Sequence, residues 1–128
     1  MSNKKILIVE DDHDVGLGYH IRLKANHYDT FFATDALSSI SEARKHQPDL
    51  IILDLGLPAG GGFAVMERLQ ADMNLAMIPV IVVTARHPYP NRQRALLAGA
   101  KAFLQKPVDN RELLDVIRKY VGEPNEPR

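Results

Sequence analysis

With 128 residues, 45% of them hydrophobic and 25% charged, the chain has the size and composition of one globular domain with a single core. It contains no cysteine, which excludes disulfides and thiolate metal sites. Its formal net charge of zero disfavours direct binding to nucleic-acid phosphates, and no apolar stretch approaches the roughly 20 residues of a membrane span. We therefore expect a cytoplasmic domain that binds neither nucleic acid nor membrane.

Three short and nearly continuous apolar runs predict strands that are buried on both faces, as in a parallel sheet. These runs span Lys5–Val9, Leu50–Asp54 and Val80–Thr84. Two weaker candidates, Asp29–Ala33 and Lys101–Leu104, bring the expected number of strands to five. Helix-like segments lie between the strands, and this alternation is typical of an α/β fold.

The segments between the strands carry helix signals of different strength. Ala36–Lys45 and Phe63–Gln70 predict helices, the second of which follows three consecutive glycines. Because Pro88 and Pro90 cannot lie in a helix interior, we expect the helix before the fifth strand to begin late. Asp109 opens a sequence that resembles a capping box, which predicts the start of the last helix.

The segment after the first strand is ambiguous. Its apolar residues alternate, which by itself favours a strand, and Gly16 and Gly18 each weaken a helix by about 1 kcal/mol. We still predict a helix, because a connection between parallel neighbouring strands needs a crossover of this length. The face expected to pack on the sheet contains Val15, Tyr19 and Leu23. Leu17 and Ile21 then lie on the outer face.

Charge and composition change along the chain. Residues 1–79 contain 7 basic and 11 acidic residues, whereas residues 80–128 contain 9 basic and 5 acidic residues. The basic half could suit an acidic partner, but a solvated surface is the simpler interpretation. We expect residues 1–121 to form one domain and residues 122–128, which are polar and include two prolines, to be a frayed tail or the start of a linker.

Polar residues follow four of the predicted strands at their carboxyl ends, where functional groups gather in parallel α/β sheets. They are Glu10, Asp11 and Asp12, then Asp54, then Thr84, then Lys106 with Pro107. Two carboxylates ~4 Å apart repel by about 4 kcal/mol at an effective dielectric of 20, so a hard cation such as Mg²⁺ would keep them ionised together. The ammonium and the hydroxyl would complete a pocket for a tetrahedral dianion. This set suits carboxylate attack on phosphorus, which forms an acyl phosphate.

Four strings of the sequence together resemble response-regulator receiver domains of two-component signalling. They are residues 6–12, 51–58, 82–85 and 99–107, and they occur in the family's order and spacing over nearly the whole chain. The resemblance implies a flavodoxin-like (βα)5 fold, with five parallel strands in the order 2-1-3-4-5 and helices on both faces. It also implies a phosphoryl-accepting switch, not an enzyme in its own right, that assists its own phosphotransfer and dephosphorylation.

The resemblance assigns roles to the residues at the strand ends. Asp54 would be the phosphoacceptor, and it would act together with Lys106 and Thr84. Asp11, Asp12 and Asp54 would hold Mg²⁺, with the backbone carbonyl of residue 56, a glycine, as a further ligand. The phosphoryl donor would be a histidine kinase or a histidine phosphotransfer protein.

The resemblance also implies a conformational switch. Thr84 would move toward the phosphoryl group, and Phe103 would turn into the space that this movement opens. The face formed by the fourth helix, fifth strand and fifth helix would then change its affinity for an effector that the sequence does not name. The bond between Lys106 and Pro107 would be cis. Leu17 and Ile21 would form a docking site for the kinase, because family members dock their kinases near this helix.

Several positions depart from the family pattern. Residues 59–62 lack the Asp of the Asp-Gly pair that most members carry after the phosphoacceptor loop. Gly56 and Arg86 stand at positions that resemble those tuning acyl-phosphate hydrolysis, so the lifetime of the product is left open. Lys101 and Ala102 replace acidic residues used in the dimers of many DNA-binding regulators, which weakens the case for that dimer. A phosphorylation-dependent homodimer of another type is left as an alternative.

Two other functions compete with the phosphorylation switch. A haloacid-dehalogenase-type phosphatase also uses an aspartate nucleophile, but it carries a second Asp two residues later, where Gly56 stands here. A receiver-like interaction module that works without phosphorylation usually lacks one of the acidic, Thr or Lys positions, and all of these are present. Metal and fluoroberyllate binding would discriminate between the switch and this last alternative.

Overall fold

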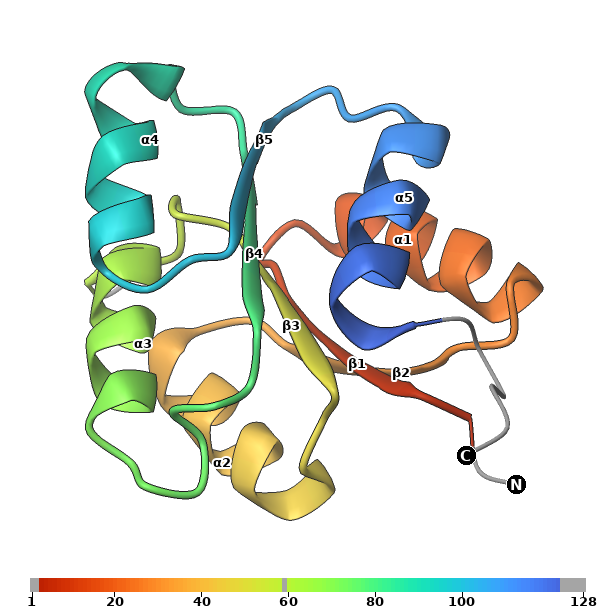
Figure 1. Cartoon of the computed structure of the whole chain (residues 1–128), viewed down its shortest axis with the longest axis horizontal. Helices are drawn as coiled ribbons and strands as arrows, with labels where there is room; N and C mark the ends of the chain where they lie inside the picture. Colours follow the sequence, from red (N-terminus) through yellow and green to blue (C-terminus); the bar gives the residue numbers. More distant parts are fainter. Residues whose placement is uncertain (1–2, 59, 123–128) are drawn as a thin grey trace.

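The computed structural model describes residues 3–58 and 60–122, in which five strands alternate with five helices (Figure 1). The order is β1 (Lys5–Val9), α1 (His13–Ala25), β2 (Asp29–Ala33), α2 (Ala36–His46), β3 (Leu50–Leu53), α3 (Gly61–Gln70), β4 (Val80–Thr84), α4 (Pro88–Leu97), β5 (Ala102–Gln105) and α5 (Asn110–Val121). Each described helix is too short or too polar to cross a membrane. The expected tail lies outside the described residues from 123 onward.

The strands form one parallel sheet in the order β2-β1-β3-β4-β5, which confirms the predicted fold class. Helices α1 and α5 cover one face and α2, α3 and α4 cover the other (Figure 1). Every residue of β3 and β4 is buried, because the sheet has a hydrophobic cluster on each side. This two-sided burial explains why these strands are continuous apolar runs in the sequence.

The ambiguous segment after β1 is a helix, as predicted. Tyr19 and Leu23 are buried against the sheet, while Leu17 and Ile21 are exposed on the outer face. The Asp12 carboxylate caps the helix by accepting hydrogen bonds from the first backbone N–H groups. Tertiary packing therefore outweighs the low helix propensity of the two glycines.

Helix α4 starts at Pro88, so both prolines lie in its first turn and not in its interior, as the sequence predicted. A proline is tolerated in the first turn of a helix, where its missing N–H would have no intrahelical partner. Tyr89 has an extended backbone, with φ −103° and ψ 126°, and its bond to Pro90 is cis. The residue before a proline is disfavoured in the helical region, so the regular part of α4 begins at Pro90.

Helix α3 starts in contact with the loop that follows β3. Gly61 has φ +70°, and a Cβ on Gly62 would lie 2.6 Å from the carbonyl oxygen of Asp54. The Gly62 N–H donates to the carbonyl oxygen of Leu55 over 3.0 Å. These contacts require glycine at both positions and fix the loop that carries Asp54.

Candidate functional site

Two neighbouring strands bring three carboxylates together at the carboxyl edge of the sheet. Val9 of β1 pairs with Leu53 of β3, so the residues that follow them, Glu10 and Asp54, lie side by side. Glu10, Asp54 and Asp11 each offer one carboxylate oxygen, and these oxygens lie within 4.8 Å of one another. Glu10 and Asp54 are only 6% and 8% exposed, whereas Asp11 is exposed.

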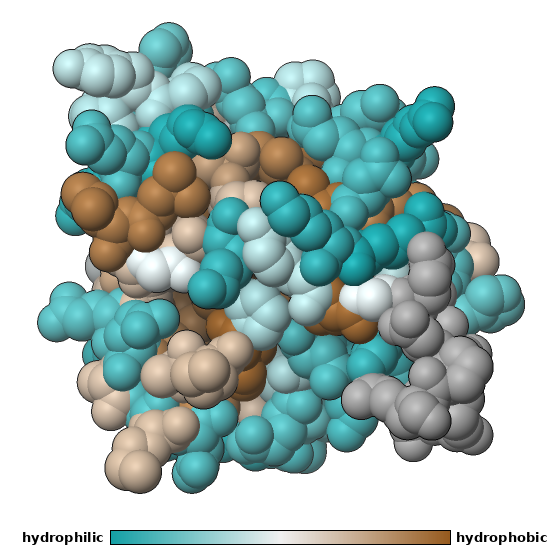
Figure 2. Space-filling view, in the orientation of Figure 1, coloured by the Kyte–Doolittle hydropathy of each residue, from teal (hydrophilic) through white to brown (hydrophobic). Residues whose placement is uncertain are grey.

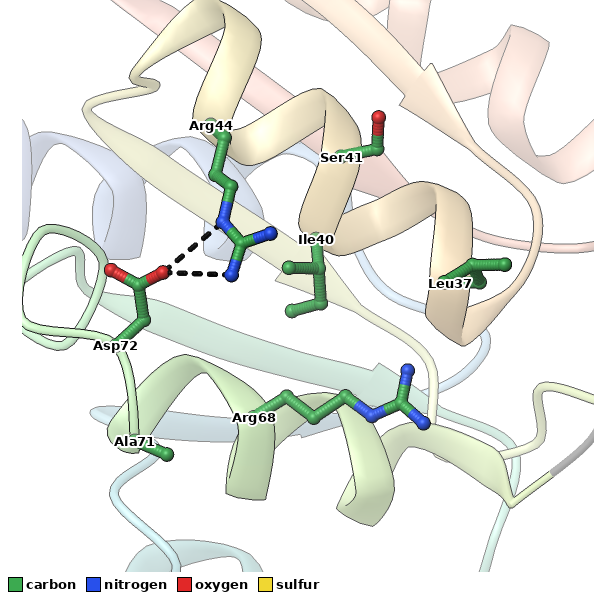
Figure 3. A pocket seen from close by; sticks show the side chains of 7 residues that line it. All are labelled: Leu37, Ile40, Ser41, Arg44, Arg68, Ala71 and Asp72. Atoms are coloured by element: carbon green, nitrogen blue, oxygen red, sulfur yellow. Dashed lines mark hydrogen bonds and ion pairs between the residues drawn. The ribbon is translucent and has the colours of Figure 1, made fainter.

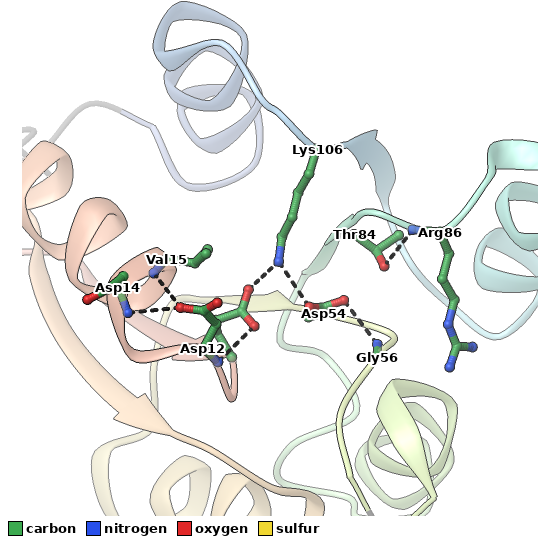
Figure 4. Close-up of polar contacts among 9 residues, drawn as sticks. Asp12, Asp14, Val15, Asp54, Gly56, Thr84, Arg86 and Lys106 are labelled. Atoms are coloured by element: carbon green, nitrogen blue, oxygen red, sulfur yellow. Dashed lines mark hydrogen bonds and ion pairs between the residues drawn. The ribbon is translucent and has the colours of Figure 1, made fainter.

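Lys106 extends from the loop after β5 toward two of these carboxylates (Figure 4). Its Nζ donates to Glu10 Oε1 and, over 3.0 Å, to Asp54 Oδ2. The backbone N–H of Lys106 donates to the carbonyl oxygen of Thr84 over 2.8 Å, which fixes the loop relative to β4. The bond to Pro107 is cis, as the resemblance implied. An ammonium group therefore lies between two buried carboxylates.

The two buried carboxylates that share the ammonium have pKa values shifted in opposite directions. Burial and the negative charge of Asp54 raise the pKa of Glu10 to about 6, although the hydrogen bond from Lys106 opposes the shift. Burial also acts on Asp54, but hydrogen bonds from the Gly56 N–H, Lys106 and Thr84 outweigh it and lower the pKa. The pKa of Lys106 rises to about 12 through its two carboxylate partners, against the effect of burial. Asp54 is therefore ionised at neutral pH, as a carboxylate nucleophile must be.

The structure separates Asp12 from this cluster. Its Oδ1 accepts hydrogen bonds from the N–H groups of Asp14 and Val15, over 3.0 and 3.2 Å, at the start of α1. Sequence reasoning had Glu10 among the strand-end acids but did not select it as a site residue. The usable signal was its position directly after the buried run of β1, which matches the position of Asp54 after β3.

The other expected site residues also lie at this edge of the sheet. The Gly56 N–H donates to Asp54 Oδ1 over 3.0 Å. Thr84 is buried, and its Oγ1 accepts a hydrogen bond from the Arg86 N–H over 3.3 Å (Figure 4). Phe103 is partly buried on the sheet face covered by α2, α3 and α4, and it belongs to the strand that pairs with β4. All residues expected from the sequence are thus near the edge, but Asp12 points into helix α1.

A hollow of about 470 Å³ between α2 and α3 is a second candidate for a binding site, away from the carboxylate cluster (Figure 3). Its lining includes Arg44 and Arg68, and Arg44 Nη2 lies 3.1 Å from Asp72 Oδ2. The hydrogen bond from the Asn74 N–H, followed by the contact with Arg44, lowers the pKa of Asp72. This ion pair joins α2 to the loop after α3, and none of the clustered carboxylates lines the hollow.

A parallel (βα)5 sheet with clustered carboxylates and a lysine at its carboxyl edge defines the receiver class of signalling domains. The sequence model of the response regulator receiver domain family matches residues 6–118, and the chain belongs to this family. It is 32% identical over 120 residues to the polar-differentiation response regulator DivK of Brucella anthropi, covering 94% of this chain and 98% of that protein. DivK of Brucella suis is equally similar.

Solved structures agree with the family assignment. The receiver domain of a sensor histidine kinase from Pseudomonas aeruginosa is 25% identical, with a TM-score of 0.86 and coverage of 95% of this chain and 100% of that chain. It was crystallised with a magnesium ion coordinated in its active-site cleft. A CheY-like receiver domain protein from Methanospirillum hungatei is 28% identical, with a TM-score of 0.86 and coverage of 94% of both chains.

Proposed function

We propose that Asp54 accepts a phosphoryl group from a phosphohistidine of a histidine kinase or a histidine phosphotransfer protein. A carboxylate oxygen of Asp54 forms a bond to phosphorus while the N–P bond of the phosphohistidine breaks, and the imidazole leaves and takes up a proton. The observation that carries this proposal is the buried, ionised Asp54 beside the Lys106 ammonium. We place this switch in the cytoplasm, where its donors carry their phosphohistidines.

We further propose that Mg²⁺ takes part, held by Asp11, Asp54 and the carbonyl of Gly56 as the sequence suggested. Glu10 replaces Asp12 in our set, because Glu10 shares the oxygen cluster whereas Asp12 caps α1. Three clustered carboxylate oxygens, two of them from buried residues, fit a hard cation that leaves room for water and phosphoryl oxygens. When bound, Mg²⁺ supplies charge neutralisation for the phosphoryl oxygens. The magnesium ion in the active-site cleft of the receiver domain from Pseudomonas aeruginosa supports a metal at this edge of the sheet.

The remaining side chains stabilise the transferred group. Lys106 already reaches Asp54 Oδ2, so its ammonium can pair with a phosphoryl oxygen as negative charge develops there. Thr84 lies at the same edge of the sheet, at the end of β4, and its hydroxyl can donate a hydrogen bond to a second phosphoryl oxygen. The same groups would assist dephosphorylation, in which water attacks the phosphorus of the acyl phosphate, the bond from Asp54 to phosphorus breaks, and inorganic phosphate leaves.

The output face that we propose is the one formed by α4, β5 and α5. The outer side of α4 is apolar, with Tyr89 and Leu97 81% and 82% exposed along a groove of about 500 Å³. Figure 2 shows a brown patch over α4. Arg92 lines this groove, and none of its lining residues is acidic. These features support an effector, or a second phosphorylated copy, that docks there once Thr84 and Phe103 move.

Labelling with acetyl phosphate tests the acceptor. We expect intact-mass spectrometry to show one added phosphoryl group on the wild type in the presence of Mg²⁺, and none after chelation. Asp54→Asn should not be labelled, because an amide is not a competent nucleophile here, while Asp115→Asn on the exposed side of α5 should be labelled normally. Equal labelling of wild type and Asp54→Asn would refute the acceptor. Failure to bind both Mg²⁺ and fluoroberyllate would favour the phosphorylation-independent module.

A further inference from the structure

Exposed apolar side chains around α2 and α3 belong neither to the carboxylate cluster nor to the proposed output face. Leu37 on α2 is 74% exposed, and Met73, in the loop after α3, is 93% exposed. Leu37 lines the hollow of about 470 Å³ between α2 and α3, and Met73 directly follows Asp72, which lines the same hollow. Apolar side chains that gather around one hollow, unlike single ones scattered over a surface, indicate a place where another molecule binds.

The hollow is a groove with an apolar floor. Ile40, which is only 7% exposed, closes the groove toward the core, and Leu37 and Ala71 add further apolar surface. The residues that α2 contributes recur three or four positions apart, so they lie on one face of this helix. They are Leu37, Ile40, Ser41 and Arg44. From residue 37 to residue 44 the groove follows α2 for roughly 10 Å, or about two helical turns.

The two arginines of the groove have different surroundings (Figure 3). At one end, the Arg44 Nε donates to Asp72 Oδ2 over 3.2 Å, and Nη2 lies 3.1 Å from the same oxygen. Arg68 extends along α3 toward the Leu37 end, and its guanidinium has no hydrogen bond or ion pair with any residue that the structure describes. The groove therefore carries one uncompensated positive charge beside exposed apolar surface.

We propose that this groove binds an acidic amphipathic helix of a partner protein, whether or not Asp54 carries a phosphoryl group. A groove between two helices receives a third helix whose apolar side chains recur every three or four residues. These side chains would pack on Leu37 and Ile40, and a Glu or Asp beside them would pair with Arg68. A basic helix would place like charge beside Arg68 and would find Asp72 already paired with Arg44.

The inference goes beyond the proposed phosphoryl transfer and does not depend on it. The groove shares no lining residue with the carboxylate cluster or with the apolar groove on α4. A helix bound between α2 and α3 therefore leaves both the phosphoacceptor and the proposed output face accessible. Such a contact would keep the switch beside its partner through the whole phosphorylation cycle.

Titration with two matched synthetic peptides tests the inference. The first is an alanine-rich peptide of about 18 residues, long enough to form a helix by itself, with leucines on one face and glutamates beside them. The second carries glutamine in place of each glutamate, so it keeps the helix propensity but not the charge. Amide chemical shifts of the whole isotope-labelled chain locate the contact, and the same titrations give both affinities.

Three variants separate charge from apolar contact. Arg68→Gln removes the unpaired charge of the groove. Arg111→Gln, in α5 on the other face of the sheet, is the control for a general loss of positive charge. Leu37→Ser removes apolar surface without opening the core, because Leu37 is exposed. Circular dichroism checks that each variant is folded, and labelling by acetyl phosphate measures the reactivity of Asp54 separately.

We expect the glutamate peptide to shift the amide signals of α2 and α3, and to bind the wild type about fivefold more tightly than the glutamine peptide does. This preference should fall below about twofold in Arg68→Gln and stay near fivefold in Arg111→Gln. Leu37→Ser should weaken the binding of both peptides alike. Fluoroberyllate with Mg²⁺ should change neither affinity by more than about twofold.

Four results would overturn the inference: no binding, shifts confined to other elements, equal affinity for the two peptides in the wild type, or an unchanged preference in Arg68→Gln. A larger effect of fluoroberyllate would overturn its independence of phosphorylation. Absence of acetyl phosphate labelling in a wild type that still binds the glutamate peptide would instead refute the proposed function alone.

Discussion

At the scale of single residues, one lysine ammonium is shared by two carboxylates with different tasks. Asp54 receives three hydrogen bonds that favour its ionised form, so its pKa is lowered despite burial. For Glu10, burial and the negative charge of Asp54 outweigh the hydrogen bond from Lys106, so its pKa rises to about 6. Burial therefore disfavours the charged form of Glu10 most, while Asp54, the proposed nucleophile, stays ionised.

This asymmetry predicts that Glu10→Gln stabilises the protein when Mg²⁺ is absent. The pKa of Glu10 is higher in the folded protein than in the unfolded chain, so ionisation of Glu10 lowers the stability of the fold. This loss of stability is absent below the unfolded pKa of 4.5 and complete above the folded pKa of about 6. One pKa unit corresponds to about 1.4 kcal/mol, so we expect the free energy of unfolding to rise by about 1–2 kcal/mol near pH 7.5. Urea denaturation followed by circular dichroism measures it.

The pH dependence of the stability gain distinguishes an effect of the Glu10 charge from an effect of altered packing. The gain of Glu10→Gln should shrink as the pH falls through about 6 and vanish below about 4.5. Asp11→Asn is the control, because Asp11 is an exposed member of the same cluster and its charge is better solvated. A gain that persists at acidic pH would show that altered packing, and not the charge of Glu10, is responsible.

Sequence reasoning placed Asp54, Thr84 and Lys106 correctly at the edge of the sheet: Asp54 follows the buried strand β3, Thr84 ends the buried strand β4, and Lys106 follows β5, a weaker strand signal. It assigned Asp11 and Asp12 to the metal site and left out Glu10, because spacing alone does not show which of the three consecutive acids after β1 face Asp54. That choice depends on the register of β1 against β3, which sets Glu10 level with Asp54. It also depends on the start of α1, where Asp12 serves as a cap. Both features depend on the three-dimensional structure and cannot be read from the spacing of residues in the sequence.

At the scale of the elements, the start of α3 determines how the loop that carries Asp54 is held. A methyl group on Gly62 would lie 2.6 Å from the Asp54 carbonyl oxygen and 2.8 Å from the Leu55 Cα. Both are backbone atoms, so neither can rotate away as a side chain would. Helix α3 and the loop after β3 consequently have to separate before any larger residue fits.

We predict that Gly62→Ala lowers the free energy of unfolding by about 2 kcal/mol or more, because overpacking against backbone forces the two elements apart. It should also slow acetyl phosphate labelling, since the displaced loop carries Asp54. Thermal and urea denaturation, together with the labelling rate, measure both effects.

The matched control is the same substitution in α1. Gly18→Ala meets no atom within 4 Å and removes the helix-weakening effect of glycine, so it should stabilise the protein by up to about 1 kcal/mol. Similar behaviour of the two variants would contradict the steric argument. The sequence predicted a helix that follows three consecutive glycines, whereas in the structure α3 includes Gly61 and Gly62, and both lie in close contact with backbone atoms.

At the scale of the whole molecule, β4 links the phosphoacceptor edge to the proposed output face. Thr84 ends β4, and its hydroxyl oxygen accepts the hydrogen bond from the Arg86 N–H, just before α4. If the hydroxyl turns toward a phosphoryl oxygen, the Arg86 N–H loses its acceptor and the loop before α4 has to adjust. The resemblance to the receiver family implied the order of the strands, but this connection depends on one side-chain orientation.

We therefore predict that fluoroberyllate with Mg²⁺, a mimic of the acyl phosphate, changes amide hydrogen exchange in residues 85–97. The region of α2 and α3 around Arg44 and Asp72 should keep its exchange rates, because its ion pair is independent of the carboxylate cluster. Thr84→Val removes the hydroxyl but keeps a branched side chain, so fluoroberyllate should still bind while the change in α4 is largely lost. Ser41→Ala, which removes an unrelated hydroxyl from α2, should behave like the wild type. An undiminished exchange response of α4 in Thr84→Val would mean that the signal travels by another route, such as Lys106 and β5.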